Sequence, residues 1–116
     1  LHEIQEESGY VPEQLQVLQP KLRIRQLQGV DLHHMPLVSL THESSDGHYH
    51  TDVAWAFVAE EPPRNPVDKS ESADLRFLTR KQLIDEPGSN IPEDIREIAL
   101  FVFDNCLQDW ERIVIS

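Results

Sequence analysis

Apolar residues near the carboxyl end of the chain recur at the spacing of an amphipathic α-helix. Between Pro92 and Trp110 they follow the i, i+3, i+4, i+7 pattern that places them on one stripe. Pro92 suits the first turn of such a helix, because proline lacks only an N–H that has no helical partner there. We expect a helix from Pro92 to about Trp110, with its stripe in the core. The stripe comprises Ile95, Ile98, Ala99, Val102, Phe103, Cys106, Leu107 and Trp110.

Earlier stretches alternate apolar and polar residues, which is typical of half-buried strands. The first, Leu15–Gln28, is interrupted by Pro20, and Leu22, Ile24 and Leu27 indicate one or two half-buried strands there. The second, Leu32–His42, contains Pro36, which indicates an edge strand or a bulge.

The stretch His48–Glu60 is the most strand-like of all, and the turn residues of Glu43–Gly47 precede it. Alternation places His48, His50 and Asp52 on one face of this strand. We expect these three side chains to line a substrate groove or to pack beside an acidic helix predicted for the first nine residues. Two histidines and a carboxylate can also hold zinc or iron, but a strand alone does not make its ligands converge.

The remaining segments complete an alternation of strands and helices. Glu61–Ser72 is rich in proline and polar residues and predicts a surface loop. Ala73–Leu78 predicts a short strand, and Thr79 is a suitable cap for a short helix over 80–85. The final residues, 112–116, fit either a terminal strand or a frayed end. Together these elements indicate an α/β (α+β) domain in which helices cover a sheet.

Length and charge narrow the class of protein. A chain of 116 residues suits one domain with one core. Its formal net charge of −11 disfavours binding to nucleic acid, which needs clustered lysine and arginine. Cys106 is the single cysteine, and no apolar run is long enough to span a membrane. We therefore expect a soluble cytoplasmic domain. Because the chain starts at Leu1 inside a predicted helix, we also expect it to be the downstream part of a longer protein.

The first residues, LHEIQEESGY, carry an unfavourable cluster of charge. Glu3, Glu6 and Glu7 are neighbours on a helical surface, and Gly9 is placed to end the helix. Carboxylates in the last turn also face the negative end of the helix dipole. The cluster is either a solvated acidic helix end or a site that a divalent cation neutralises.

The segment His2–Tyr10, HEIQEESGY, resembles the second half of the Nudix box, G-x(5)-E-x(7)-R-E-U-x-E-E-x-G-U, where U is aliphatic. Glu3 matches the glutamate of the R-E pair, Glu6 and Glu7 match the E-E pair, and Gly9 matches the glycine. His2 replaces the arginine of the family, and Tyr10 replaces an aliphatic residue. The first half of the box would lie upstream of Leu1.

Downstream segments resemble the order of elements in the same family. Glu71 precedes ADLRFL as a glutamate precedes a strand and a short helix in Nudix proteins, where in some members it binds metal or acts as a base. The resemblance implies a Nudix-like α/β/α sandwich with a mixed sheet. Residues 1–116 would form a single domain that lacks its N-terminal part.

The resemblance also implies an activity. Nudix hydrolases cleave the pyrophosphate bond of a nucleoside diphosphate linked to another group, with Mg²⁺ or Mn²⁺ as cofactor. By resemblance, Glu6 and Glu7 bind the metal, and Glu3 binds or orients it or accepts a proton. Glu71 would add a fourth carboxylate. Catalytic candidates are thus Glu3, Glu6, Glu7 and Glu71, and metal candidates are Glu3, Glu6 and Glu7.

Two departures from the family leave an alternative open. His2 can pair with the box glutamates only when protonated, and the ordinary pKa of histidine is near 6.5. The 116 residues also lack the loop and strands of the first half of the box, so we expect them alone to be inactive. The alternative is a weak or inactive Nudix-like module that binds nucleotides. The expected partner is a small nucleotide-type molecule, and the family also allows a homodimer.

Overall fold

A short central strand organises the body of the molecule. The computed structural model describes residues 8–64 and 77–115, and in it β1 (Gln16–Gln19) pairs antiparallel with β4 (Phe57–Val58) and with β5 (Glu111–Val114). Val17 and Leu18 of β1 are only 1% and 2% exposed. A single 3-10 turn, η1 (Pro12–Gln14), leads into the strand. The terminal strand that the sequence left open is therefore formed by β5.

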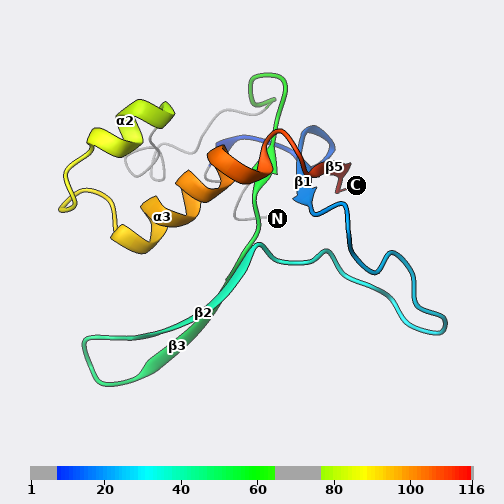
Figure 1. The fold of residues 1–116 in the computed structure, drawn as a ribbon, viewed down its shortest axis with the longest axis horizontal. Helices are drawn as coiled ribbons and strands as arrows, with labels where there is room; N and C mark the ends of the chain where they lie inside the picture. Colours follow the sequence, from blue (N-terminus) through cyan, green and yellow to red (C-terminus); the bar gives the residue numbers. More distant parts are fainter. Residues whose placement is uncertain (1–7, 65–76, 116) are drawn as a thin grey trace.

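A two-stranded hairpin extends away from this body. It consists of β2 (Val38–Glu43) and β3 (Tyr49–Ala54), paired in antiparallel register (Figure 1). The predicted turn between them is confirmed. The Ser44 N–H donates to His48 O at 2.7 Å, and Gly47 adopts a φ of +85°, which favours glycine.

The continuous strand predicted over His48–Glu60 is broken in two. β3 ends at Ala54, and β4 begins at Phe57 in the other sheet. The two residues between them make the transition, since the Leu18 N–H of β1 donates to Ala56 O at 2.9 Å. The alternation of apolar and polar residues continues across this break, because β3 and β4 are both extended. It does not show that the two strands pair with different partners.

The two predicted helices form, but the second is shorter than expected. α2 (Arg80–Asp85) begins at Thr79, whose Oγ1 accepts from the Gln82 N–H at 3.1 Å, as predicted. α3 (Glu93–Phe101) follows Pro92 and passes into a π-helical turn, η3 (Val102–Cys106). The predicted helix to Trp110 therefore ends early, since the chain must reach β5 at Glu111 to pair with β1.

The apolar stripe of the second helix is only partly in the core. Within α3, all of which the structure describes, no residue is buried, and Ile95 and Phe101 are 52% and 49% exposed. The prediction that this stripe is core was wrong for α3, because its contact with the short helix α2 leaves the apolar side chains at least partly exposed. Cys106 in η3 is fully buried, and burial raises the pKa of its thiol, as expected for a packing residue.

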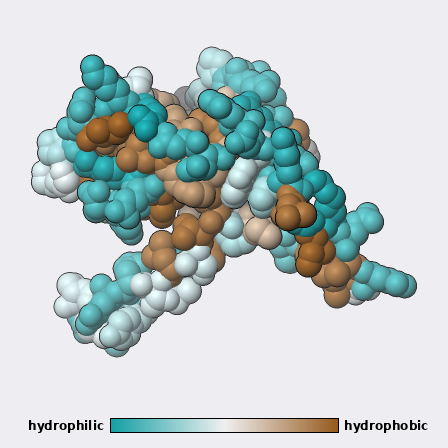
Figure 2. Space-filling model, in the orientation of Figure 1, coloured by the Kyte–Doolittle hydropathy of each residue, from teal (hydrophilic) through white to brown (hydrophobic). Residues whose placement is uncertain are grey.

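Residues 20–35 form an exposed excursion, which we call the arm. The second strand predicted in this region is absent there, and Leu22 and Ile24 are 95% and 64% exposed. Figure 2 shows apolar surface along the arm, which projects on the opposite side of the body from the hairpin. The radius of gyration is 15.9 Å, against about 13 Å for a compact chain of this length.

One buried glutamine closes the base of the arm. The Gln19 side chain donates to Met35 O and accepts from the Met35 N–H, both at 2.8 Å, and it is 2% exposed. This reciprocal pair satisfies two backbone groups that no strand partner reaches. The two ends of the arm are therefore fixed, although its apolar side chains face solvent.

A second glutamine fixes the start of the proline-rich loop. Gln14 Nε2 donates to Glu61 Oε1 at 2.8 Å and to Pro62 O at 2.9 Å, while its Oε1 accepts from the Arg64 N–H at 2.9 Å. The rest of this loop, and most of the strand predicted over Ala73–Leu78, lie outside the described residues.

The described residues thus form a small α+β structure with five strands in two antiparallel sheets and two α-helices. The mixed sheet expected from the sequence is not found among them, because every described strand pair is antiparallel. A short turn connects β2 to β3, and such a connection permits only antiparallel pairing.

Replacing the glutamine that closes the arm tests its structural role. We expect Gln19→Ala to lower the free energy of unfolding by about 1–3 kcal/mol, because it leaves two backbone groups of Met35 without partners. Urea denaturation measures this change. Gln28→Ala, on an exposed part of the arm, is the control and should change stability by less than about 0.5 kcal/mol. Equal effects of the two substitutions would contradict the role of Gln19.

Candidate functional site

The carboxylates predicted to hold metal lie outside the described residues. This applies to Glu3, Glu6, Glu7 and Glu71. The end of the acidic segment is described: Ser8 is helical, and Gly9 adopts a φ of +81° and is buried. A left-handed glycine directly after a helix is the conformation expected of a helix-ending glycine.

The histidines predicted to line a groove are on the hairpin. His50 and Asp52 belong to β3, whereas His48 lies in the turn before it. His42 of β2 lies opposite His50. The Nε2 atom of His42 is 2.8 Å from Asp52 Oδ2. All four residues are exposed, so the hairpin presents an open polar face.

The transition-metal alternative gains no support from this hairpin. Among residues 8–64 and 77–115, no group of three or more histidine, cysteine or acidic side chains is arranged to hold a metal ion. His42 and Asp52 instead pair with each other, which occupies one ring nitrogen and one carboxylate oxygen.

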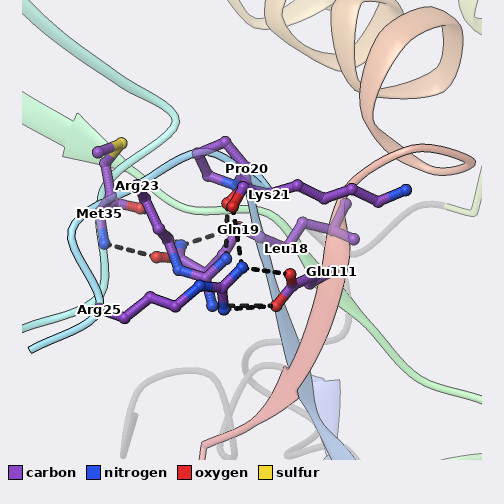
Figure 3. A network of polar contacts seen from close by, with 8 residues as sticks. All are labelled: Leu18, Gln19, Pro20, Lys21, Arg23, Arg25, Met35 and Glu111. Carbon is purple, nitrogen blue, oxygen red and sulfur yellow. Dashed lines mark hydrogen bonds and ion pairs between the residues drawn. The ribbon is translucent and has the colours of Figure 1, made fainter.

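The most connected polar cluster involves residues that the sequence analysis did not select. Glu111, the first residue of β5, accepts from two arginines of the arm (Figure 3). Arg23 Nη2 donates to Glu111 Oε2 at 3.1 Å. Arg25 binds both oxygens, with distances of 3.1 Å from Nη1 to Oε2 and 2.6 Å from Nη2 to Oε1. These ion pairs thus hold the first part of the arm against β5.

Backbone carbonyls hold the same arginines in place. Arg23 Nη1 donates to Pro20 O at 2.6 Å, and Arg25 Nη2 donates to Lys21 O at 2.9 Å. The Arg23 side chain is 10% exposed, while the Arg25 side chain is 53% exposed. Arg23 is therefore a largely buried cation, and Arg25 forms the outer edge of the cluster.

The two guanidinium groups strongly favour the charged form of Glu111. Their hydrogen bonds, first that of Arg25 and then that of Arg23, lower the pKa of Glu111 from 4.5 to about 2. The same pair raises the pKa of Arg25. The Glu111 carboxylate is consequently charged across the neutral pH range, and one carboxylate between two guanidinium groups leaves one positive charge in excess.

A pocket of about 660 Å³ opens beside this cluster. Its polar lining includes Gln19, Arg23, Arg25 and the two histidines of the arm, His33 and His34. The apolar part of the lining consists of Ile24, Leu32, Met35 and Ile113. Its volume lies within the range of about 300–1,000 Å³ that is usual for small-molecule sites.

Sequence reasoning could not find this pocket, because its parts are far apart in the chain. Arg25 and Glu111 are separated by 86 positions. Arg23 and Arg25 are suitable phosphate contacts by residue type, but exposed arginines are common on protein surfaces. The alternation of Arg23, Ile24 and Arg25 was the only local signal.

Comparisons with protein-family models, with curated proteins and with solved structures gave no match to this chain. Within the part of the chain that the structure describes, no helix has the length and apolar character needed to cross a membrane.

The lowered pKa of Glu111 predicts a pH-dependent stability. A carboxylate with a pKa of 4.5 when unfolded and about 2 when folded stabilises the fold fully above about pH 4.5. That contribution is lost as the pH falls toward about 2. We therefore expect the difference in unfolding free energy between the natural chain and Glu111→Gln to shrink across this window.

Urea denaturation at several pH values measures this difference. Glu13→Gln, which removes a negative charge from an exposed side chain, is the matched control. The same pH dependence for both variants would show that the arginine pairs of Glu111 do not stabilise the fold.

Proposed function

We propose that this chain belongs to a Nudix-type hydrolase that cleaves the pyrophosphate bond of a nucleoside diphosphate derivative with Mg²⁺ or Mn²⁺. The observation that carries the proposal is the half box from His2 to Tyr10, with three glutamates at the expected spacing before Gly9. The left-handed backbone of Gly9 supports this interpretation, because the motif requires a glycine where the helix ends.

The donor set suits a hard divalent cation. The sequence spacing of Glu3, Glu6 and Glu7 would bring three carboxylates together on a helix, and carboxylate oxygens are ligands that Mg²⁺ prefers. Glu6 and Glu7 would hold the metal, and Glu3 would orient it or accept a proton. Glu71 would supply a further carboxylate from the proline-rich loop. When bound, the metal neutralises phosphate charge and acidifies a water molecule.

The proposed fold extends the described α+β structure to a Nudix-like α/β/α sandwich. In that arrangement His48, His50 and Asp52 would lie along the substrate side of the hairpin. A homodimer and a small nucleotide-type substrate are part of the same proposal.

One substitution favours a second candidate function. His2 replaces the arginine that pairs with the box glutamates in the family. A neutral imidazole at that position would not hold the carboxylates by charge. A Nudix-like module that binds nucleotides with little or no hydrolysis is therefore the alternative.

Hydrolysis assays on the full-length natural protein separate these two functions. We expect Mg²⁺-dependent release of phosphate products from at least one of nucleotide sugars, dinucleoside polyphosphates, ADP-ribose, NADH or oxidised nucleoside triphosphates. Glu6→Gln and Glu7→Gln should each reduce the rate by about 10²-fold or more, because each removes a ligand that holds the metal at the reacting phosphate.

Glu13→Gln, which lies just beyond the box, is the matched control and should retain the activity. Nucleotide binding without turnover would favour the module. If Mg²⁺ or Mn²⁺ titration shows no ion bound at Glu3, Glu6 and Glu7, the hydrolase proposal is wrong.

A further inference from the structure

The pocket between the arm and β5 is lined by positively charged side chains, whereas the chain as a whole is negatively charged. The whole sequence has a net charge of −11, yet no carboxylate is among the described residues that line this pocket. Its polar lining includes Arg23, Arg25, His33 and His34. The pocket therefore has a basic lining on a chain whose net charge is strongly negative.

The arginines keep donors that their present partners do not use. An arginine has five N–H donors, and the bonds described for Arg23 use only two of them, to Pro20 O and to Glu111. Glu111 is shared between both guanidinium groups, so one positive charge is not compensated. Planar guanidinium groups held in fixed positions are suited to bidentate contact with phosphate oxygens.

The pocket also has an apolar part. Ile24, Leu32, Met35 and Ile113 line the same pocket as the two arginines. A ligand that carries both a phosphate and an apolar or aromatic body would match both parts. A long polyanion would not, because the remaining surface is strongly negative.

We propose that this pocket binds a small phosphate monoester with an apolar body, such as a nucleoside monophosphate. Arg25 and Arg23 contact the phosphate, and the apolar lining contacts the body. Binding here needs no metal ion and involves none of the acidic residues of the half box. The proposal is therefore independent of the hydrolase function, and either can fail without the other.

Calorimetric titration in the presence of EDTA tests the proposal with three probes: AMP, inorganic phosphate and adenosine. We expect AMP to bind, phosphate to bind more weakly, and adenosine to bind least. If inorganic phosphate binds as tightly as AMP, the ligand of the pocket is free phosphate and not a phosphate monoester. Adenosine binding as tightly as AMP, or no binding of AMP at millimolar concentration, would overturn the proposal.

Variants separate a binding role from a structural one. Arg25→Gln should weaken AMP binding about tenfold, since it removes a charge-assisted hydrogen bond. Arg80→Gln is the matched control, because Arg80 forms an exposed ion pair with Asp104 away from the pocket. It should leave binding unchanged. Equal losses in the two variants would overturn the proposal.

A further measurement does not depend on the loss of an arginine. In amide NMR spectra of the natural chain, AMP should shift signals of residues 23–26 and 32–35. Shifts confined to the hairpin, residues 38–54, would place the ligand elsewhere.

Discussion

The ion pairs between Glu111 and two arginines of the arm are the constraint on which the rest of the structure depends. Glu111 pairs with Gln19 in the β1–β5 register and also binds Arg23 and Arg25. One carboxylate therefore joins the central sheet, the carboxyl-terminal strand and the arm. Among residues 8–64 and 77–115 few apolar side chains are buried, so polar contacts of this kind matter more for holding the arm in place.

Local signals in the sequence predicted local features well. The cap at Thr79, the turn at Gly47 and the helix-ending glycine at Gly9 were each readable from two or three neighbouring residues. Such features depend on short-range sterics and on side-chain to backbone hydrogen bonds, which the local sequence determines.

Features that depend on distant partners were missed. The alternation in the arm is strand-like, but Gln19 closes the arm onto Met35 and no neighbouring strand reaches Leu22 or Ile24. The apolar stripe of α3 continues beyond Phe101, yet the chain turns toward β5 because that strand pairs with β1. The arginine pocket needs Glu111 from the far end of the chain. Local periodicity carries no information about such partners.

The arm and the hairpin project on opposite sides of the body, and this affects hydrodynamic measurements. The molecule measures 46 × 37 × 28 Å along its principal axes. An elongated particle diffuses more slowly than a sphere of equal mass and elutes earlier from a sizing column. A single chain would therefore run with an inflated apparent mass, so light scattering or sedimentation equilibrium is the sound way to count its subunits.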